Sequence, residues 1–200
     1  QGFVLTNTLQ MTVAYNAIGT GGKVVRPFVI KQHLGPDNKV IREYEPSVVR
    51  DLGDPNGEYR IPKEIFEVVK EGMRLVVNGE RGTARGSVRL GYIEVAGKTG
   101  TSQVMSFSAD QLYLKCENRP KKQRHHGWFI GYAPADNPEI AFGILAEHSC
   151  HGASGAGPIA KAIVDTYFRK YHPTLVQREL EKKGKRVPGP ASVTAPVVER

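Results

Sequence analysis

Three stretches of the chain carry apolar residues at the spacing of an α-helix. The first can be capped by Asn7 or Thr8 and ended by a group of glycines, and its apolar positions are Met11, Ala14, Tyr15 and Ile18. The second begins at Pro62, a residue that suits the first turn of a helix because its missing N–H has no partner there. Its apolar positions are Ile65, Val68, Val69, Met73 and Val76. The third helix is predicted from Ile159, Ala162, Ile163 and Tyr167.

Gly72 lies on the apolar face of the second predicted helix. Glycine inside a helix costs up to about 1 kcal/mol relative to alanine. Its presence here predicts close packing of this helix against a neighbouring element.

The segments between these helices read as β-strands. Residues 24–34 are rich in β-branched side chains, a turn follows at 35–38, and residues 39–44 return, so a hairpin is predicted with an edge position at Pro27. Residues 92–105 predict a long strand interrupted by Gly97 and Gly100. The apolar runs 128–132 and 140–146 flank a turn and predict a second hairpin. The order of elements predicts an α+β fold, an antiparallel sheet packed with helices.

Composition supports one folded unit with a polar end. Apolar residues make up 40% of the 200 positions, with 22 glycines in addition, which is the level of an ordinary globular domain. No run approaches the ~20 apolar residues that a membrane span needs. Residues 1–171 are expected to form the folded domain. Residues 172–200 are charged and then rich in Pro, Ala and Val, and we expect a flexible tail.

The net charge of +8 is concentrated in two basic clusters. They are Lys115, Arg119, Lys121, Lys122 and Arg124, and Arg169, Lys170, Arg178, Lys182, Lys183, Lys185 and Arg186. Such clusters favour anionic partners, but a solvated loop and tail explain them better. Both clusters lack the interleaved aromatic residues of a single-strand nucleic-acid groove, so no nucleic-acid partner is predicted.

Several residue groups suggest chemistry that their spacing does not support. Cys116 and Cys150 can pair in an oxidising compartment or remain thiols, and the sequence leaves both open. The histidines at 125, 126, 148 and 151 have no paired C-x-x-C spacing beside them, so neither a metal nor another cofactor is predicted. Ser154 lies in a near match to G-x-S-x-G that ends in Ala156 and is not led into by a strand. A small-residue turn into the last helix explains it better.

The stretch Lys98-Thr99-Gly100-Thr101-Ser102 places a cation, hydroxyls and a glycine on one predicted strand. A lysine beside hydroxyl groups can hold a carboxylate through charge-assisted hydrogen bonds. A glycine lets a ligand approach the backbone, and an edge strand offers a free N–H to a developing oxyanion. Strand alternation puts the side chains of Lys98 and Thr99 on opposite faces.

Lys98-Thr99-Gly100 matches the K-T-G motif of penicillin-binding proteins and serine β-lactamases. Three further segments resemble the same family in the same order. They are Gln1-Gly2-Phe3 with the helix after it, residues 127–134 with the turn at 137–141, and Glu147-His148-Ser149-Cys150-His151-Gly152. Together they resemble the C-terminal portion of the transpeptidase domain of a class B penicillin-binding protein, most closely the elongation type, penicillin-binding protein 2. In that family Gly-Gly usually stands where this chain has Ser149-Cys150.

The resemblance implies a peptidoglycan D,D-transpeptidase that crosslinks stem peptides through a serine acyl-enzyme and is inhibited by β-lactams. It assigns the substrate's carboxylate to Lys98, Thr99, Gly100, Thr101 and Ser102, and the oxyanion to the backbone N–H of Thr101. Ser102 does not begin S-x-x-K and no S-x-N triplet occurs, so the nucleophile is expected upstream of this chain and the fragment alone inactive.

The resemblance also implies partners and a location. The partners are the remainder of the transpeptidase domain and proteins of the cell-elongation machinery. The location is the periplasmic face of the inner membrane, with the anchor in an upstream segment.

Two other interpretations remain open from the residues. The chain can be a non-catalytic module that binds cell-wall polymer or penicillin, in which case the basic clusters dominate binding. It can also belong to a serine β-lactamase or a sensor of that fold, although the length between Val104 and Trp128 speaks against this.

Overall fold

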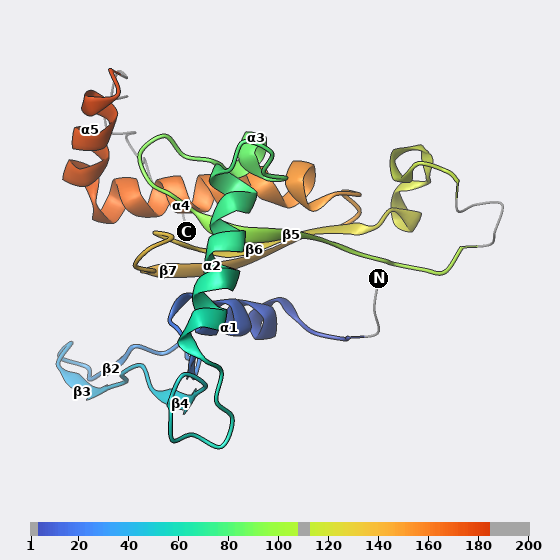
Figure 1. Cartoon of the computed structure of the whole chain (residues 1–200). Helices are drawn as coiled ribbons and strands as arrows, with labels where there is room; N and C mark the ends of the chain where they lie inside the picture. Colours follow the sequence, from blue (N-terminus) through green and yellow to red (C-terminus); the bar gives the residue numbers. More distant parts are fainter. Residues whose placement is uncertain (1–3, 108–112, 185–200) are drawn as a thin grey trace.

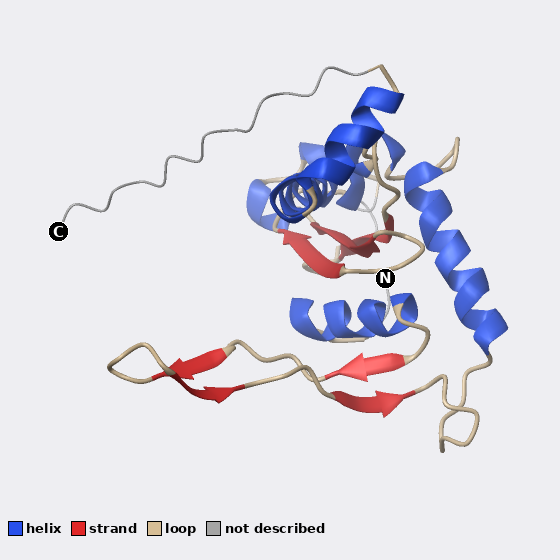
Figure 2. Cartoon of the chain, turned by 90° about the vertical axis from the view of Figure 1, so that its left-hand side faces the viewer, coloured by secondary structure: helices blue, strands red, loops and turns tan. Residues whose placement is uncertain are grey.

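A three-stranded antiparallel sheet forms the centre of the computed structural model, which describes residues 4–107 and 113–184. The sheet consists of β5 (Ala96–Ser102), β6 (His126–Ala133) and β7 (Ile140–Ala146), with β6 in the middle. Helices lie on both of its faces, as Figures 1 and 2 show. The predicted α+β class, an antiparallel sheet packed with helices, is confirmed.

Helix α1 (Thr8–Gly19) covers one face of the sheet (Figure 1). Asn7 caps it, because its side chain accepts a hydrogen bond from the Gln10 N–H while the Gln10 side chain accepts one from the Asn7 N–H. Gly143 on β7 makes room for the Thr12 side chain. The first predicted helix is therefore confirmed at both ends.

The opposite face of the sheet carries the main core. It is covered by α4 (Gly157–Tyr171), with α3 (Arg85–Val88) and α5 (Pro173–Lys182) packed beside it. The residues that α4 buries are Gly157, Ala160, Val164 and Phe168. The predicted face was wrong by about one position, since Ile159 and Ile163 are exposed. Both sets have helical spacing, so spacing alone could not choose between them.

Helix α5 corrects the predicted tail. Val176 and Leu180 of α5 belong to the main core cluster. The expectation of a flexible segment from residue 172 is therefore wrong for residues 173–182. Residues 185–200 lie outside the described part of the chain.

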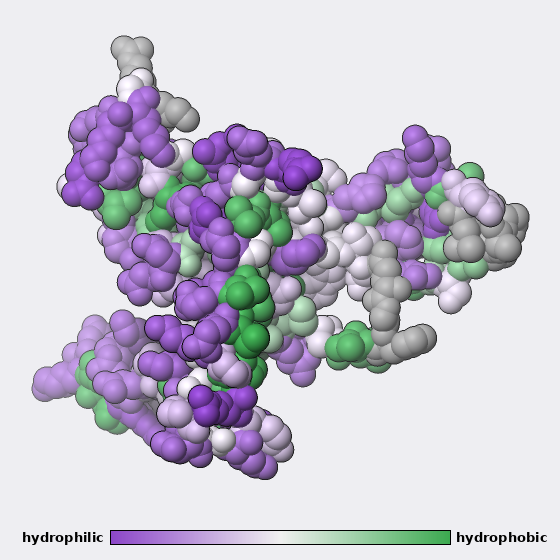
Figure 3. Space-filling view, in the orientation of Figure 1, coloured by the Kyte–Doolittle hydropathy of each residue, from purple (hydrophilic) through white to green (hydrophobic). Residues whose placement is uncertain are grey.

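Helix α2 (Lys63–Asn78) runs beside β5 and buries Phe66, Met73 and Val77. Most of the predicted apolar stripe faces outward instead, with Val68 71% exposed, and Figure 3 shows this hydrophobic band along the helix. The close packing predicted at Gly72 is also wrong, because among the described residues nothing lies within 4 Å of the place where a Cβ would be.

Two small hairpin-like sheets extend from the end of α1 (Figure 2). Strand β1 (Lys23–Val25) pairs with β4 (Val48–Asp51), and β2 (Gln32–Leu34) pairs with β3 (Val40–Glu43). The predicted strand 24–34 is thus two strands, interrupted near Pro27, which has no N–H to donate to a ladder. The turn at 35–38 is confirmed.

Candidate functional site

Strand β5 lies at an edge of the sheet within the described residues, and β6 is its neighbour on the other side. Thr101 lies opposite Gly127 of β6. The N–H of Gly127 donates to Ser149 Oγ at 3.2 Å, so it points away from β5. In an antiparallel ladder the residue opposite such a position turns its own N–H outward. The backbone N–H groups of Thr101 and, two positions earlier, Thr99 are therefore directed at the open edge.

The side chain of Lys98 bends around this edge. Its ammonium donates to the backbone carbonyl of Thr99 at 2.9 Å and approaches Thr99 Oγ1 at 3.4 Å. Alternation does put the two Cβ atoms on opposite faces, but the four-carbon stem of lysine is long enough to bring its nitrogen back to the edge. The cation and the Thr99 hydroxyl consequently lie in one place.

A hollow of about 230 Å³ lies beside this edge. Lys98, Thr99, Gly100 and Ser102 line it from β5. Trp128 and Ile130 of β6, Met11 and Tyr15 of α1, and residues 4–6 complete its wall. Four of the five predicted residues therefore meet around one space, and Thr101 contributes from the same edge.

Two residues that the sequence did not single out hold β5 from the side of α2. Thr83 Oγ1 lies 3.3 Å from Thr99 Oγ1. Asn78, at the end of α2, donates from its side-chain amide to the carbonyls of Val95 and Arg74, each at 2.9 Å. No local pattern in the sequence indicates that Asn78 contacts a segment 17 residues later.

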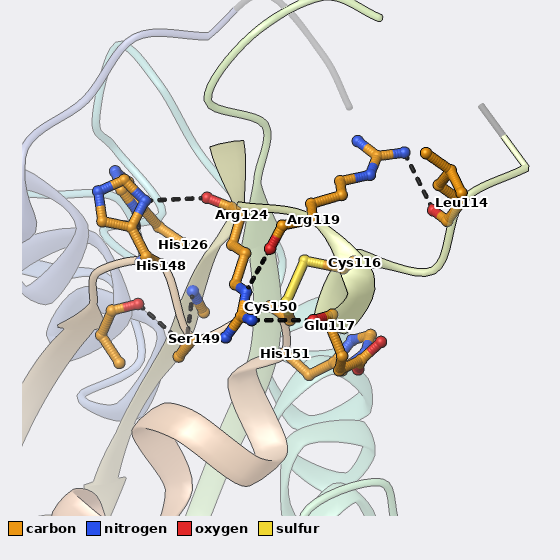
Figure 4. Close-up of a disulfide and its surroundings, with 12 residues drawn as sticks. Leu114, Cys116, Glu117, Arg119, Arg124, His126, His148, Ser149, Cys150 and His151 are labelled. Carbon is orange, nitrogen blue, oxygen red and sulfur yellow. Dashed lines mark hydrogen bonds and ion pairs between the residues drawn. A yellow bond between two sulfur atoms is a disulfide. The ribbon is translucent and has the colours of Figure 1, made fainter. Parts of the chain in front are cut away.

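The cysteines form a disulfide between Cys116 in the short helix η1 (Cys116–Asn118) and Cys150 in the turn after β7 (Figure 4). The neighbouring histidines have partners of other kinds. His126 Nδ1 accepts the N–H of His148, and His151 Nε2 lies 2.8 Å from Glu117 Oε1. Among the described residues, no three of His, Cys, Asp and Glu gather as metal ligands would. Ser154 lies in the π-helical turn η3 (Gly152–Ala156).

A larger hollow, of about 500 Å³, lies between the end of α1 and the start of α2. Lys23, Lys63, Lys70, Glu67 and Asp136 are among the residues that line it. None of the residues 98–102 lines this larger hollow. We place the candidate site at β5, because there a cation, hydroxyl groups and outward backbone N–H groups share one edge.

The fold and the groups at the open edge of β5 are those of one protein family, which comparison of the chain with known families identifies. The family described as "Penicillin binding protein transpeptidase domain" matches residues 1–165. The chain therefore belongs to the penicillin-binding protein transpeptidase domain family, which confirms the resemblance drawn from the K-T-G and neighbouring motifs.

Individual relatives of the chain belong to the same family. The chain is 32% identical over 176 residues to the peptidoglycan D,D-transpeptidase MrdA of Haemophilus influenzae, covering 88% of this chain and 26% of that protein. It is 33% identical over 175 residues to MrdA of Acinetobacter baumannii, covering 86% and 24%. The chain thus spans about a quarter of the length of these relatives.

Solved structures show the same fold. Pseudomonas aeruginosa PBP2 in complex with WCK 5153 superposes with a TM-score of 0.59 at 25% identity, covering 86% of this chain and 32% of that one. The imipenem acyl-enzyme of penicillin-binding protein A from M. tuberculosis gives 0.61 at 23% identity, covering 84% and 32%. In the part of our chain that the structure describes, no helix has both the length and the apolar character to cross a membrane.

Proposed function

We propose that the chain is the substrate- and β-lactam-binding part of a peptidoglycan D,D-transpeptidase, which crosslinks cell-wall stem peptides through a serine acyl-enzyme. The observation that carries this proposal is the open edge of β5. There the Lys98 ammonium, the Thr99 hydroxyl and the outward N–H of Thr101 lie beside a hollow of about 230 Å³. Membership of the transpeptidase family supports it.

Each group has a distinct role in the proposed reaction. Lys98 and Thr99 bind the carboxylate of the terminal D-alanine by charge-assisted hydrogen bonds. The N–H of Thr101 donates to the oxygen that becomes negative when the serine attacks the peptide carbonyl. The acyl-enzyme then passes to an amine of a second stem peptide. Gly100 keeps the strand surface free of a side chain, and Ser102 also lines the hollow.

The nucleophile is proposed to come from residues outside 1–200. No serine in the chain begins S-x-x-K, and Ser102 is followed by Gln103, Val104 and Met105. Two surfaces are suited to receive the remainder of the domain. One is the exposed apolar band of α2, which includes Ile65 and Val68, and the other is the edge of β7, which no described strand pairs.

Location and further partners belong to the same proposal. Likeness to MrdA proteins supports placement at the periplasmic face of the inner membrane, with an anchor outside these residues, and action together with the cell-elongation machinery. A disulfide between Cys116 and Cys150 is compatible with an oxidising compartment.

The test is acylation of the complete protein by a fluorescent penicillin. Lys98→Ala is expected to lower the second-order acylation rate by about 10²–10³-fold, the size of effect seen when one preorganised stabilising group is lost. Lys161→Ala is the matched control, because Lys161 is an exposed lysine on α4 away from β5. It is expected to react as the wild type does.

Two results would contradict the proposal. Equal rates for Lys98→Ala and Lys161→Ala would remove Lys98 from the site. Stoichiometric labelling of a polypeptide limited to residues 1–200 would show that the nucleophile lies within them.

A further inference from the structure

The loop between β5 and β6 is fastened to the turn that follows β7 (Figure 4). The disulfide joins Cys116 to Cys150. On either side of it, His151 Nε2 contacts Glu117 Oε1 at 2.8 Å, and the N–H of Cys150 donates to the carbonyl of His125 at 2.9 Å. The two cysteines are 34 residues apart in the sequence. His148 Nδ1 adds a further contact between the segments, 3.1 Å from the Arg124 carbonyl oxygen.

The fastened turn packs on the ladder between β5 and β6, where a Cβ at Gly152 would meet the Trp128 carbonyl oxygen. A Cβ at Gly152 would lie 2.7 Å from the carbonyl oxygen and 3.0 Å from the nitrogen of Gly100, so the turn packs on that peptide backbone. Ser149 Oγ accepts the N–H of Gly127, the residue opposite Thr101. On one side of Cys150, Gly152 touches the Gly100 backbone that precedes the Thr101 N–H; on the other side, Ser149 binds the strand that pairs with Thr101.

The conformation of this turn depends on its contacts. His148 has φ 55° and Cys150 has φ 68°, both in the left-handed region that residues with a side chain rarely adopt. Backbone preference thus works against the turn. The contact between Glu117 and His151 joins two side chains that are 56% and 59% exposed, and such a pair is a weak fastening by itself. The disulfide is the strongest of the fastenings.

We propose that the Cys116–Cys150 disulfide is a positioning element of the substrate edge. By fixing the turn 148–152 it holds the Gly100–Thr101 backbone in the alignment that the oxyanion requires. Cys116 and Cys150 are positioning residues, since neither touches the hollow beside β5. This inference rests on the proposed function for its effect on acylation, and on geometry alone for its effect on the order of β5.

The experiment uses the complete protein with the disulfide removed in two ways. Cys116→Ser breaks the bond and keeps the side chain at 150. Cys116→Ser combined with Cys150→Gly also relieves the left-handed backbone strain. Lys122→Ser is the matched control, because it changes an exposed residue of the same loop and leaves the disulfide intact.

Two quantities are measured well below the melting temperature of every variant. The first is acylation by fluorescent penicillin, resolved into the binding constant and the rate of the acylation step. The second is hydrogen–deuterium exchange of peptides that cover residues 96–102. Both disulfide variants are expected to acylate about five- to a hundredfold more slowly, mainly in the acylation step, because small displacements of a catalytic group are costly. Exchange in 96–102 is expected to become faster.

A purely stabilising disulfide predicts a different pattern. In that case removing the disulfide lowers the melting temperature while acylation stays within about twofold of wild type, and that result would overturn the proposal. So would faster exchange confined to residues 113–125, or the finding of two free thiols in the wild-type protein. If the wild type itself is not acylated, the proposed function fails, and the exchange of 96–102 still decides the role of the disulfide. If a variant does not fold, wild-type protein mildly reduced with a phosphine and then reoxidised gives the same comparison.

Discussion

The two ends of β5 are held in different ways. At its start, Ala96 and the preceding Val95 are completely buried, and the side-chain amide of Asn78 donates to the carbonyl of Val95. At its end, Lys98 is exposed and residues 99–102 are partly exposed, held by β6 and by the turn that the disulfide fastens. The start of the strand is therefore fixed by the core, and the end by its pairing with β6 and by the fastened turn. We therefore expect substitutions near the start of β5 to change mainly the unfolding free energy, and substitutions near its end to change mainly the acylation rate.

The two glycines of the strand show the same division. A Cβ at Gly97 would lie 2.6 Å from Phe129 Cζ, so this glycine is required by the core. At Gly100 the contact is looser, 3.2 Å to the Trp128 Cβ, and the position lines the hollow. Gly97 therefore makes room for a core side chain, and Gly100 keeps open the strand surface beside the hollow.

The largest effect on the core end is expected from Phe168→Ala. Phe168 on α4 is 1% exposed and belongs to the cluster that contains Val95. Removing a buried phenyl ring costs about 3–5 kcal/mol of unfolding free energy. Denaturant unfolding of the complete protein measures the loss, and Tyr171→Ala, on an exposed site of the same helix, is the control.

Phe168→Ala also tests whether the core and the site at the end of β5 are independent. Acylation per folded molecule is expected to be unchanged in Phe168→Ala, because the side chain is remote from the hollow beside β5. A tenfold fall in acylation at a temperature where the variant is fully folded would show that the core governs the site edge as well.

A smaller effect is expected from Asn78→Ala. The substitution removes the donor to the Val95 and Arg74 carbonyls and leaves them without that partner. Loss of one side of a buried hydrogen bond costs about 1–3 kcal/mol. Asn56→Ala is the control, since Asn56 lies exposed in the loop before α2. Equal unfolding free energies for the two variants would mean that the Asn78 contact adds nothing to the start of β5.

The sequence predicted those features of the fold that depend on local patterns, and missed those that depend on contacts between distant segments. Strand β7 was predicted to the residue, and β6 to within two residues at either end, because continuous apolar runs and turn residues are local signals. The buried faces of α2 and α4 were not predicted correctly. Both helices carry apolar residues on two sides, and which side is buried depends on the elements that pack against it. Lys98 and Thr99 were found through a motif. Thr83, Asn78 and the pairing of the cysteines required the folded chain, because each contact joins segments far apart in sequence.

The smallest effect is expected at Tyr132, which lies opposite Ala96 at the core end of β5. Its ring is fully buried, and its hydroxyl has no hydrogen-bond partner among the described residues. Tyr132→Phe is therefore expected to leave the unfolding free energy unchanged or to raise it by up to about 1 kcal/mol. Tyr92→Phe is the contrast, because the Tyr92 hydroxyl donates to Asp165 Oδ1 at 2.8 Å and its loss should destabilise.

The pH dependence gives a second measurement on Tyr132. Burial, and secondarily the charge of Glu67, raises the pKa of Tyr132 to about 12, whereas an unfolded tyrosine titrates near 10. The folded state therefore keeps its proton longer than the unfolded state, and the contribution to stability that is present below pH 10 is lost as the pH rises from 10 to 12. Between pH 10 and 12 the unfolding free energy of the wild type should fall more steeply with pH than that of Tyr132→Phe. Burial also raises the pKa values of Tyr15 and Tyr92, so part of the fall remains in both proteins. Identical slopes would mean that the Tyr132 hydroxyl reaches solvent, and that the core end of β5 is less tightly closed than its burial indicates.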